Sequence, residues 1–294
     1  MVDNSQTLVV IVTTYNRLAL AQRAVSSVID AKGHHNWVHI LVVDDGSDGD
    51  TAEQLEKAFA ERSFITVYPI EENAGCNHAR QVGLSWVTRH YPGAWVSYLD
   101  DDDILVPTVI DEFDVCRKTH NAQWFAFSAL LDNGNYDSKF PKPGFYNYLI
   151  DTMGKRRVTG DFQDFFNESY ARDLAFSTRF KNAEEWVFWS QLAHRVDTYI
   201  PGKDGVHKVY LAGGLSQGGM NRDKRLAVAQ YKAEILNGLL APRYYSDILR
   251  NVARALIHNK QRQSAIAVAK QAIATYPLNI KAYLCLFRSY FLRH

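Results

Sequence analysis

The chain has 294 residues, 33 of them Lys or Arg and 32 Asp or Glu, which gives a formal net charge of +1 at pH 7. Because 47% of the residues are hydrophobic, the chain can bury a substantial core, which indicates a globular protein of one large or two modest domains. The balanced charge and the lack of a long basic run argue against a nucleic-acid-binding protein.

The cysteines and the N-terminus bear on the cellular compartment. Three widely spaced cysteines without paired metal-ligand spacing are typical of a protein from a reducing compartment. The first apolar run, residues 8–12, is too short for a signal-peptide core or a membrane span. We therefore predict a cytoplasmic protein and leave peripheral association with the inner face of the membrane open. The densest basic cluster, residues 155–157, is interpreted as a solvated surface loop.

The N-terminal third of the chain alternates between two patterns. Continuous apolar runs rich in β-branched residues predict buried strands, and apolar residues at helical spacing predict the helices between them. The predicted strands are residues 8–12, 38–43, 64–69 and 94–99, and the predicted helices are residues 18–31, 51–60 and 78–89. This alternation implies right-handed parallel crossovers and an α/β sheet covered by helices.

Polar clusters follow the predicted strands. They are residues 13–17, Asp44 with Asp45, residues 73–80, and residues 100–103. In open α/β sheets, ligands bind outside the carboxyl ends of the strands. The four clusters are therefore expected to meet at one edge of the sheet.

The most informative cluster is residues 100–103, four consecutive Asp after a buried strand. Adjacent carboxylates repel one another unless something positive lies near them. Hard divalent cations such as Mg²⁺ and Mn²⁺ take oxygen ligands, and Mg²⁺ usually keeps one or two protein carboxylates and completes its shell with substrate phosphates. The run therefore predicts a metal and diphosphate site at a strand end, with a solvated loop as the alternative.

The pattern changes after Pro107. A helix is predicted over residues 108–119 and an aromatic strand over residues 123–130, and a stretch rich in Gly, Pro, Asn and Tyr, residues 132–148, predicts a long loop over the site. From residue 222 onward the pattern is helical and amphipathic. Within it, residues 265–287 resemble half of a tetratricopeptide unit, but without a second copy we prefer a helical cap or a dimer surface.

Four motifs together resemble family 2 glycosyltransferases of the GT-A fold. They are VTTYNR at residues 12–17, VDDGSDGDT at residues 43–51, NAG followed by ARQVG within residues 73–83, and LDDDDI at residues 99–104 with Pro107. The last of them resembles the family's Asp-x-Asp metal motif. Any one of these motifs is weak evidence, but four in the correct order and spacing are specific, and the resemblance extends from residue 8 to about residue 186.

The resemblance implies a fold and a division of the chain. The expected fold is α/β, a GT-A (Rossmann-like) mostly parallel sheet flanked by helices, with a C-terminal helical extension. Residues 1–115 would form the half that binds the nucleotide-sugar, and residues 116–221 the half that binds the acceptor and carries the catalytic base. Residues 222–294 would form the helical extension.

The resemblance also implies roles for particular side chains. Residues expected to bind the nucleotide are Thr13, Tyr15, Arg17, Asp44, Asp45, Arg80, Asp100 and Asp101. Among them Asp45 would contact the base and Arg80 the diphosphate, since a planar guanidinium pairs well with phosphate oxygens. Asp102 would ligate Mn²⁺ or Mg²⁺. Taken without its neighbours, the Asp44–Asp45 pair would be explained equally well as a turn with a helix cap. His207 is left out of the metal site, because a lone His beside a strand is more often structural.

Family members that resemble this chain invert the anomeric centre by direct displacement, and an acidic pair before an aromatic residue supplies the base. Here Glu184 and Glu185 precede Trp186, with Glu where the family usually has Asp. We assign Glu185 as the base and place Glu184 second, with Asp161 and Asp164 as the next alternatives. The structural alternative is that the two Glu simply stabilise the N-terminus of a helix.

The implied activity is that of a metal-dependent inverting glycosyltransferase. It would transfer a sugar from a nucleotide-sugar donor, with a UDP-sugar favoured, to a hydroxyl of a glycan or lipid-linked glycan, as in the synthesis of bacterial surface polysaccharides. One alternative is a phosphotransferase of the haloacid-dehalogenase type, with Asp100 and Asp102 as nucleophile and acid. Another is a degenerate module that binds nucleotide-sugars and uses its helical tail as a scaffold. A homo-oligomer formed through the C-terminal helices stays open.

Overall fold

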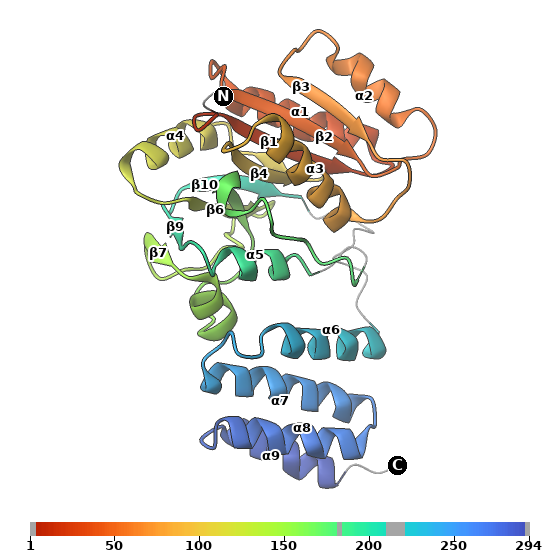
Figure 1. The fold of residues 1–294 in the computed structure, drawn as a ribbon, viewed down its shortest axis with the longest axis vertical. Helices are drawn as coiled ribbons and strands as arrows, with labels where there is room; N and C mark the ends of the chain where they lie inside the picture. The colour runs from red at the N-terminus through yellow and green to blue at the C-terminus, as the bar shows by residue number, and fades with distance from the viewer. Residues whose placement is uncertain (1–3, 181–183, 210–220, 292–294) are drawn as a thin grey trace. The chain divides into compact units, whose positions relative to one another are not determined.

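A computed structural model describes residues 4–180, 184–209 and 221–291 of the chain (Figure 1). The chain forms two compact units. The first unit comprises Met1–Tyr148 and Arg157–Ala212, and the second comprises Leu149–Arg156 and Gly213–His294. The division expected inside the first unit, at residue 115, stays a prediction.

The N-terminal half of the first unit is a parallel sheet with helical crossovers. Its strands are β1 (Leu8–Thr14), β2 (Val38–Asp44), β3 (Ile65–Pro69) and β4 (Trp95–Asp100), and its helices are α1 (Leu18–Lys32), α2 (Thr51–Phe59) and α3 (Cys76–His90). β1 lies between β2 and β4, β3 borders β2, and all three pairings are parallel. The predicted alternation is thus confirmed, and each element begins and ends within two residues of the predicted position.

The other half of the sheet is mixed. After β4 come β5 (Ile104–Leu105), α4 (Val109–Thr119), β6 (Trp124–Leu131), β8 (Phe162–Asn167) and β10 (Asp204–Lys208). β8 pairs antiparallel with both β4 and β6, so β4 and β6 run in the same direction, as the α4 crossover between them requires. They leave a gap of one strand, which β8 fills in the opposite direction. β10 then pairs parallel with β6 and antiparallel with β5.

The loop predicted over residues 132–148 is interrupted by a short strand, β7 (Gly144–Tyr146). β7 pairs antiparallel with β9 (Thr198–Ile200), which borders β6. Aromatic side chains suit a pleated, half-buried surface, which explains a strand at Phe145 and Tyr146 inside a Gly-rich and Pro-rich stretch. The chain then forms a π-helical turn over Tyr148–Gly154, most of which belongs to the second unit, a 3₁₀ turn over Glu168–Tyr170, and α5 (Trp186–Leu192).

The core of the first unit covers both faces of β1. The strand is apolar without alternation because helices lie on both sides of it. Leu8, Val10 and Val12 belong to the cluster that includes the buried residues of α1 and α4. On the opposite face the side chain of Ile11 lies against Gly83 of α3. This two-sided burial fixes the position of the polar residues that follow β1.

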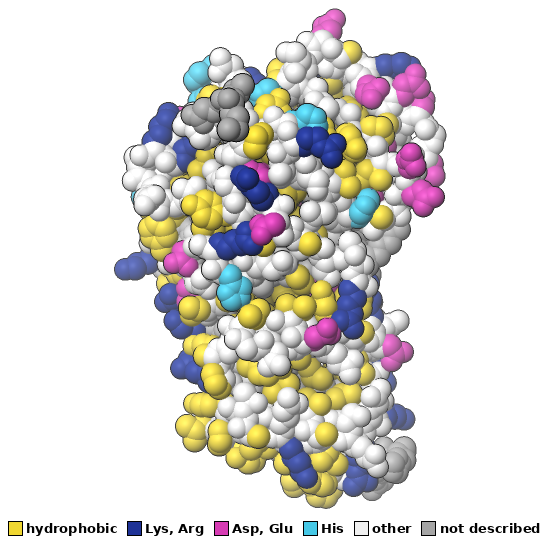
Figure 2. All heavy atoms as spheres, in the orientation of Figure 1, with side chains coloured by type: hydrophobic (Ala, Val, Ile, Leu, Met, Phe, Trp, Pro, Cys, Tyr) yellow, Lys and Arg dark blue, Asp and Glu magenta, His cyan; other side chains and the backbone are white. Residues whose placement is uncertain are grey.

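In the C-terminal part of the second unit, residues 221–291 form four consecutive α-helices. They are α6 (Arg222–Ile235), α7 (Pro242–His258), α8 (Arg262–Thr275) and α9 (Ile280–Tyr290). Small buried residues, Ala253, Ala269 and Cys285, bring α7, α8 and α9 together. The predicted helical character after residue 222 is confirmed, and Figure 2 shows hydrophobic side chains at the surface over α9. Within the described residues, none of the helices is both long enough and apolar enough to span a membrane.

We predict that Gly83→Ala destabilises the first unit. A Cβ at position 83 would lie 2.7 Å from Cγ2 of Ile11 and 3.4 Å from Cγ2 of Val43. Overpacking of this kind costs about 1–3 kcal/mol, which exceeds the gain of about 1 kcal/mol in helix propensity from Gly to Ala. Urea unfolding should therefore show a net loss of roughly 1 kcal/mol. Ser85→Ala, on the exposed side of α3, is the control, with a change within about 0.5 kcal/mol. Equal stability of Gly83→Ala and the wild type would contradict the close approach of α3 and β1.

Candidate active site

The polar clusters that follow β1, β2 and β4 meet at the carboxyl edge of the parallel strands, as predicted. The Thr14 hydroxyl, at the end of β1, donates a hydrogen bond of 2.7 Å to the carboxylate of Asp101, which follows β4. The Asn16 amide donates one of 2.9 Å to Asp48, in the loop after β2. Side chains far apart in the sequence are therefore brought together at one place by the register of the sheet.

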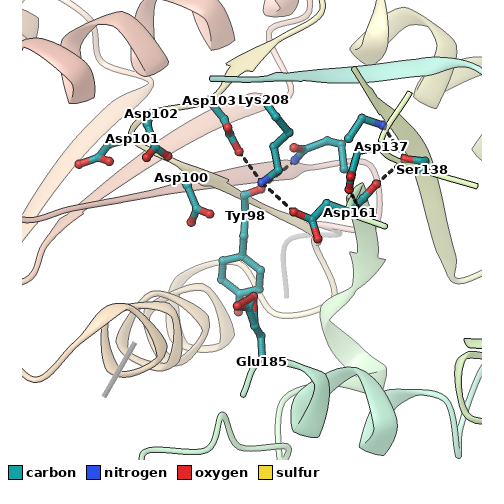
Figure 3. A network of polar contacts seen from close by, with 12 residues as sticks. Tyr98, Asp100, Asp101, Asp102, Asp103, Asp137, Ser138, Asp161, Glu185 and Lys208 are labelled. Carbon is teal, nitrogen blue, oxygen red and sulfur yellow. Dashed lines mark hydrogen bonds and ion pairs between the residues drawn. The ribbon is translucent and has the colours of Figure 1, made fainter. Parts of the chain in front are cut away.

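The four consecutive aspartates have different environments (Figure 3). Asp101 and Asp103 are buried, whereas Asp100 and Asp102 are partly exposed. Carboxylate oxygens of Asp100, Asp102 and Asp103 lie within 4.8 Å of one another. An oxygen-only group of this kind fits a hard divalent cation such as Mg²⁺ or Mn²⁺. Asp101 is directed elsewhere, toward Thr14 and Arg17.

Three cationic side chains from three different elements offset the charge of this run. Arg17, after β1, places Nη1 3.0 Å from Asp101 and 3.1 Å from Asp102. Arg80, on α3, places Nη2 2.6 Å from Asp100. Lys208, at the end of β10, places Nζ 2.8 Å from Asp103 and 3.5 Å from Asp161, and Figure 3 shows it reaching between these two carboxylates. Each pair satisfies a charge that would otherwise be costly to bury.

Burial makes two of the aspartates hard to ionise. It raises the pKa of Asp101 to about 6, although the hydrogen bond from Thr14 and the charge of Arg17 act in the opposite direction. It raises the pKa of Asp103 to about 7, with Lys208 opposing the shift and Asp100 adding to it. These two carboxyl groups therefore carry less negative charge near neutral pH than two free aspartates would.

Asp100 behaves differently because it faces cations. Burial opposes its ionisation, but the charges of Arg80 and Lys208 outweigh burial and hold its pKa below the usual range. Arg80 is itself buried, and the charges of Asp100 and Glu185 outweigh that burial and hold its pKa well above the usual range. Both shifts favour the charged forms, so Asp100 and Arg80 form an ion pair at the rim.

Arg80 also connects the aspartate run to the predicted base. Its Nη1 lies 3.3 Å from the carboxylate of Glu185 and 3.3 Å from the amide oxygen of Asn77, and it donates a hydrogen bond to the latter. Asn77 in turn donates a hydrogen bond of 2.8 Å to the carbonyl of Ser177. A buried guanidinium held on several sides has little freedom to turn away, so Asp100 and Glu185 are kept at neighbouring positions.

The two glutamates before α5 differ in orientation. Glu185 is 48% exposed by side chain and faces Arg80. Glu184 is buried, has a φ of 76°, and accepts a hydrogen bond from the indole nitrogen of Trp186. Left-handed backbone at a residue other than Gly costs of order 1 kcal/mol and is concentrated at functional sites. The residue that precedes this pair, Ala183, lies outside the described residues.

The pair Asp44–Asp45 fastens one loop to the end of β2. The Asp45 carboxylate accepts hydrogen bonds from the Asn73 side chain at 2.8 Å and from the backbone of Gly75 at 2.7 Å. Gly46 has a φ of 71°, and a Cβ there would lie 2.6 Å from the backbone nitrogen of Asn73. Asp44 is buried, which raises its pKa, and it accepts a hydrogen bond from Ser47. Both carboxylates thus have a structural role at the rim, and contact of Asp45 with a base stays a prediction.

The other predicted residues also lie at this edge. Thr13 is buried at the end of β1, and Tyr15 is 41% exposed in the loop that follows. The alternatives for the base lie beyond the aspartate run, on and before β8. Asp164 accepts a hydrogen bond of 2.6 Å from the indole of Trp124, and burial raises its pKa to about 7. Asp161 is exposed and lies next to Lys208.

Residues 9–113 match the family described as Glycosyl transferase family 2. The chain carries a family 2 glycosyltransferase domain. Two curated relatives are glycosyltransferases by name. The glycosyltransferase GlyA of Streptococcus pneumoniae is 27% identical over 217 residues, which are 72% of this chain and 29% of GlyA. The GalNAc(5)-diNAcBac-PP-undecaprenol beta-1,3-glucosyltransferase of Campylobacter jejuni is 23% identical over 292 residues, 96% of this chain and 87% of the relative. The chain spans only about a third of the length of some of the curated relatives it matches.

A solved structure confirms the predicted fold class. Residues 1–349 of S. aureus TarS, in complex with UDP-GlcNAc, superpose with a TM-score of 0.70 at 17% identity. The superposition covers 97% of this chain and 89% of the TarS chain. The predicted GT-A type of α/β fold with a C-terminal helical region is therefore confirmed, and the family assignment sets the haloacid-dehalogenase interpretation aside.

Lys208 lies in the candidate site, and the sequence did not reveal it. We considered its neighbour His207, which is exposed and pairs in register with Ile104 of β5. Successive residues of a strand point to opposite faces, so Lys208 points to the other side, where Asp103 lies. A Lys at the end of a short strand carries no local signal of its own. Only the pairing of β10 with β5 and β6 brings it to the aspartate run.

The raised pKa of Asp164 predicts a pH effect on the stability of the protein. The protonated carboxyl is favoured in the fold, so its contribution to stability is complete below the pKa of the unfolded chain and is lost as the pH rises through about 7. Asp164→Asn cannot ionise and keeps an oxygen to accept the Trp124 hydrogen bond. Its free energy of unfolding relative to the wild type should therefore rise by roughly 1–3 kcal/mol between pH 4.5 and about 7.5.

Asp173→Asn provides a control of opposite sign. Asp173 pairs with Arg195 at the surface, mainly through a hydrogen bond that lowers its pKa to about 2. Its contribution is present above the pKa of the unfolded chain and is lost as the pH falls, so this variant should differ from the wild type less in acid than at neutral pH. Urea unfolding at several pH values measures both differences. A difference for Asp164→Asn that is flat with pH would contradict the assignment.

Proposed function

We propose that the chain is a metal-dependent inverting glycosyltransferase whose donor is a UDP-sugar. The observation that carries this proposal is the group Asp100, Asp102 and Asp103 next to Arg80, at the end of β4 in a family 2 domain. The TarS structures with UDP-GlcNAc and with UDP, which share the fold, support a uridine nucleotide as the donor. The donor would bind along the edge formed by Thr13, Tyr15, Arg17, Asp44, Asp45, Arg80, Asp100 and Asp101.

For the acceptor, we propose a hydroxyl of a lipid-linked glycan. The Campylobacter relative, which aligns along 96% of this chain, carries undecaprenol and a glycan in its name. A lipid-linked acceptor places the reaction at a membrane surface, and we propose the cytoplasmic face and a role in bacterial surface polysaccharide synthesis.

The carboxylates of the aspartate run fit a divalent cation by their chemistry. Asp102, with Asp100 and Asp103, would hold Mn²⁺ or Mg²⁺ through oxygen atoms already within 4.8 Å of one another. The cation, when bound, would act as a Lewis acid on the diphosphate leaving group. Arg80 and Arg17 are positively charged and lie at the same edge. Diphosphate oxygens would compete with Asp100 and Asp101 for these two guanidinium groups.

Glu185 is the best placed of the four candidate bases. It is partly exposed, so an acceptor hydroxyl can reach it, and Arg80 keeps it next to Asp100. Glu184 accepts a hydrogen bond from Trp186. Asp164 accepts one from Trp124, and burial raises its pKa to about 7, so it is partly protonated at neutral pH. In the displacement, the acceptor oxygen bonds to the anomeric carbon as the bond from that carbon to the diphosphate oxygen breaks. Glu185 takes the hydroxyl proton, and the diphosphate leaves with the bonding electrons.

We predict that Asp102→Ala abolishes the effect of metal on UDP binding. Calorimetry of the wild-type protein should show that Mn²⁺ tightens UDP binding, and the variant should lose at least about tenfold of that gain, the equivalent of about 1.4 kcal/mol. Asp132→Ala, an exposed acidic position in the loop after β6, is the matched control and should bind as the wild type does. If Asp102→Ala kept the full response to Mn²⁺, the proposed metal site would be wrong.

A second variant, Glu185→Gln, tests the base. It should keep Mn²⁺-dependent UDP binding and lower the rate of UDP release from the donor by about 10²–10⁴-fold, because the amide cannot accept the proton. The assay is a screen of UDP-sugars for metal-dependent UDP release. Glu184→Gln, at the neighbouring position, is the control and should retain most of the rate.

Full activity of Glu185→Gln would move the base to Asp161 or Asp164. If the wild-type protein bound UDP and Mn²⁺ but released UDP from none of the donors, the binding-module interpretation would replace the enzyme.

A further inference from the structure

The last helix of the described chain, α9, has two sides with opposite environments. One side is buried within the second unit through Ala282, Cys285 and Ser289. The other side is apolar and exposed, and we call it the α9 apolar face. It consists of Ile280, Tyr283, Leu284, Phe287, Tyr290 and Phe291. Figure 2 shows hydrophobic side chains gathered there, at the lower end of the view.

The α9 apolar face is too regular to be a scatter of surface residues. Ile280, Tyr283, Leu284 and Phe287 follow the spacing i, i+3, i+4 and i+7, which places them on one stripe of a helix. Such a stripe normally faces a core, yet Ile280 is 74% exposed and Phe287 is 62% exposed. A contiguous exposed apolar surface of this kind marks a site of interaction with a partner or a membrane.

The charge of the surrounding sequence indicates what covers it. Residues 222–294 contain thirteen Lys and Arg and three Asp and Glu, a net charge of +10. Residues 1–221 contain twenty Lys and Arg and twenty-nine Asp and Glu, a net charge of −9. On α9 itself, Lys281 and Arg288 are exposed and, at 100° per residue, lie along one edge of the apolar stripe. The apolar face is thus set in a strongly basic unit.

We propose that the α9 apolar face docks on an anionic lipid surface. A helix with Phe, Leu and Ile on one side and Lys and Arg beside them binds in the plane of the interface, with its apolar side in the boundary between headgroups and acyl chains. Tyr side chains, such as Tyr283 and Tyr290, suit the same depth because they have an apolar ring and a polar tip. The basic residues add electrostatic attraction to anionic headgroups.

The same charges disfavour a second copy of the chain as the occupant. An isologous dimer through this face would bring together two copies of residues 222–294, each with a net charge of +10, and like-charge contact of that size opposes association. A neutral apolar partner would leave the basic surroundings without a function. The inference depends on the second unit alone and does not rest on the proposed glycosyl transfer.

The test measures binding of the full chain to lipid vesicles by co-sedimentation. Vesicles of equal parts phosphatidylcholine and phosphatidylglycerol should bind the protein at least about tenfold more tightly than vesicles of phosphatidylcholine alone, and added salt should weaken this binding. Leu284→Ser and Phe287→Ser should each weaken it by about tenfold. Lys281→Gln and Arg288→Gln should each weaken it by about fivefold.

Val115→Ser is the matched control, because Val115 is 56% exposed on α4 of the first unit. It should bind vesicles as the wild type does. The charge variants keep the test decisive if the apolar variants prove poorly folded by circular dichroism. Vesicle binding that none of the four α9 substitutions weakens would overturn the proposal. So would a dimer in sedimentation velocity that Phe287→Ser dissociates. UDP release measured without vesicles reports on the proposed enzyme separately, and the α9 variants should not change it.

Discussion

Repulsion among four adjacent aspartates is the constraint on which the first unit depends. The side chains that offset it come from the loop after β1, from α3 and from β10, and the contact between Lys208 and Asp103 spans 105 positions of the sequence. None of these cations is near the run until the sheet has formed its order. The electrostatic cost of the site is therefore offset by contacts that exist only in the folded state.

The nearby cations and burial do not affect the four aspartates equally, and this difference organises the site. Burial pushes Asp101 and Asp103 toward the protonated form, whereas Arg80 holds Asp100 as an anion. Because Arg80 also contacts Glu185, a continuous line of charged contacts runs from the aspartate run to the residue proposed as the base. In the proposed reaction, negative charge develops on the diphosphate while a proton moves to Glu185. Because Arg80 contacts both Asp100 and Glu185, its positive charge would act on both of these changes.

Local patterns predicted the parallel half of the sheet and most of its rim, because buried strands and strand-end polar clusters are written in neighbouring residues. Arg17 and Arg80 could be found for the same reason, since each lies inside a motif. β8 could not be placed, because its antiparallel position between β4 and β6 depends on pairings between distant strands. Lys208 depended on the same information. Asp45 also accepts hydrogen bonds from Asn73 and Gly75, which the motif did not predict. A motif can identify a residue of the site, but it does not predict all the contacts that the residue makes.

A net charge of +1 also concealed the separation between an acidic first part and a basic C-terminal part. The two parts have opposite electrostatic tasks in the proposals made here. In the first part, carboxylates would bind the cation that accompanies the diphosphate. In the C-terminal part, Lys and Arg would attract an anionic surface. A lipid-linked acceptor is confined to a membrane, so an enzyme held on that membrane meets it at a higher effective concentration than one free in solution. Docking through α9 would therefore favour glycosyl transfer without any contact between α9 and the acceptor.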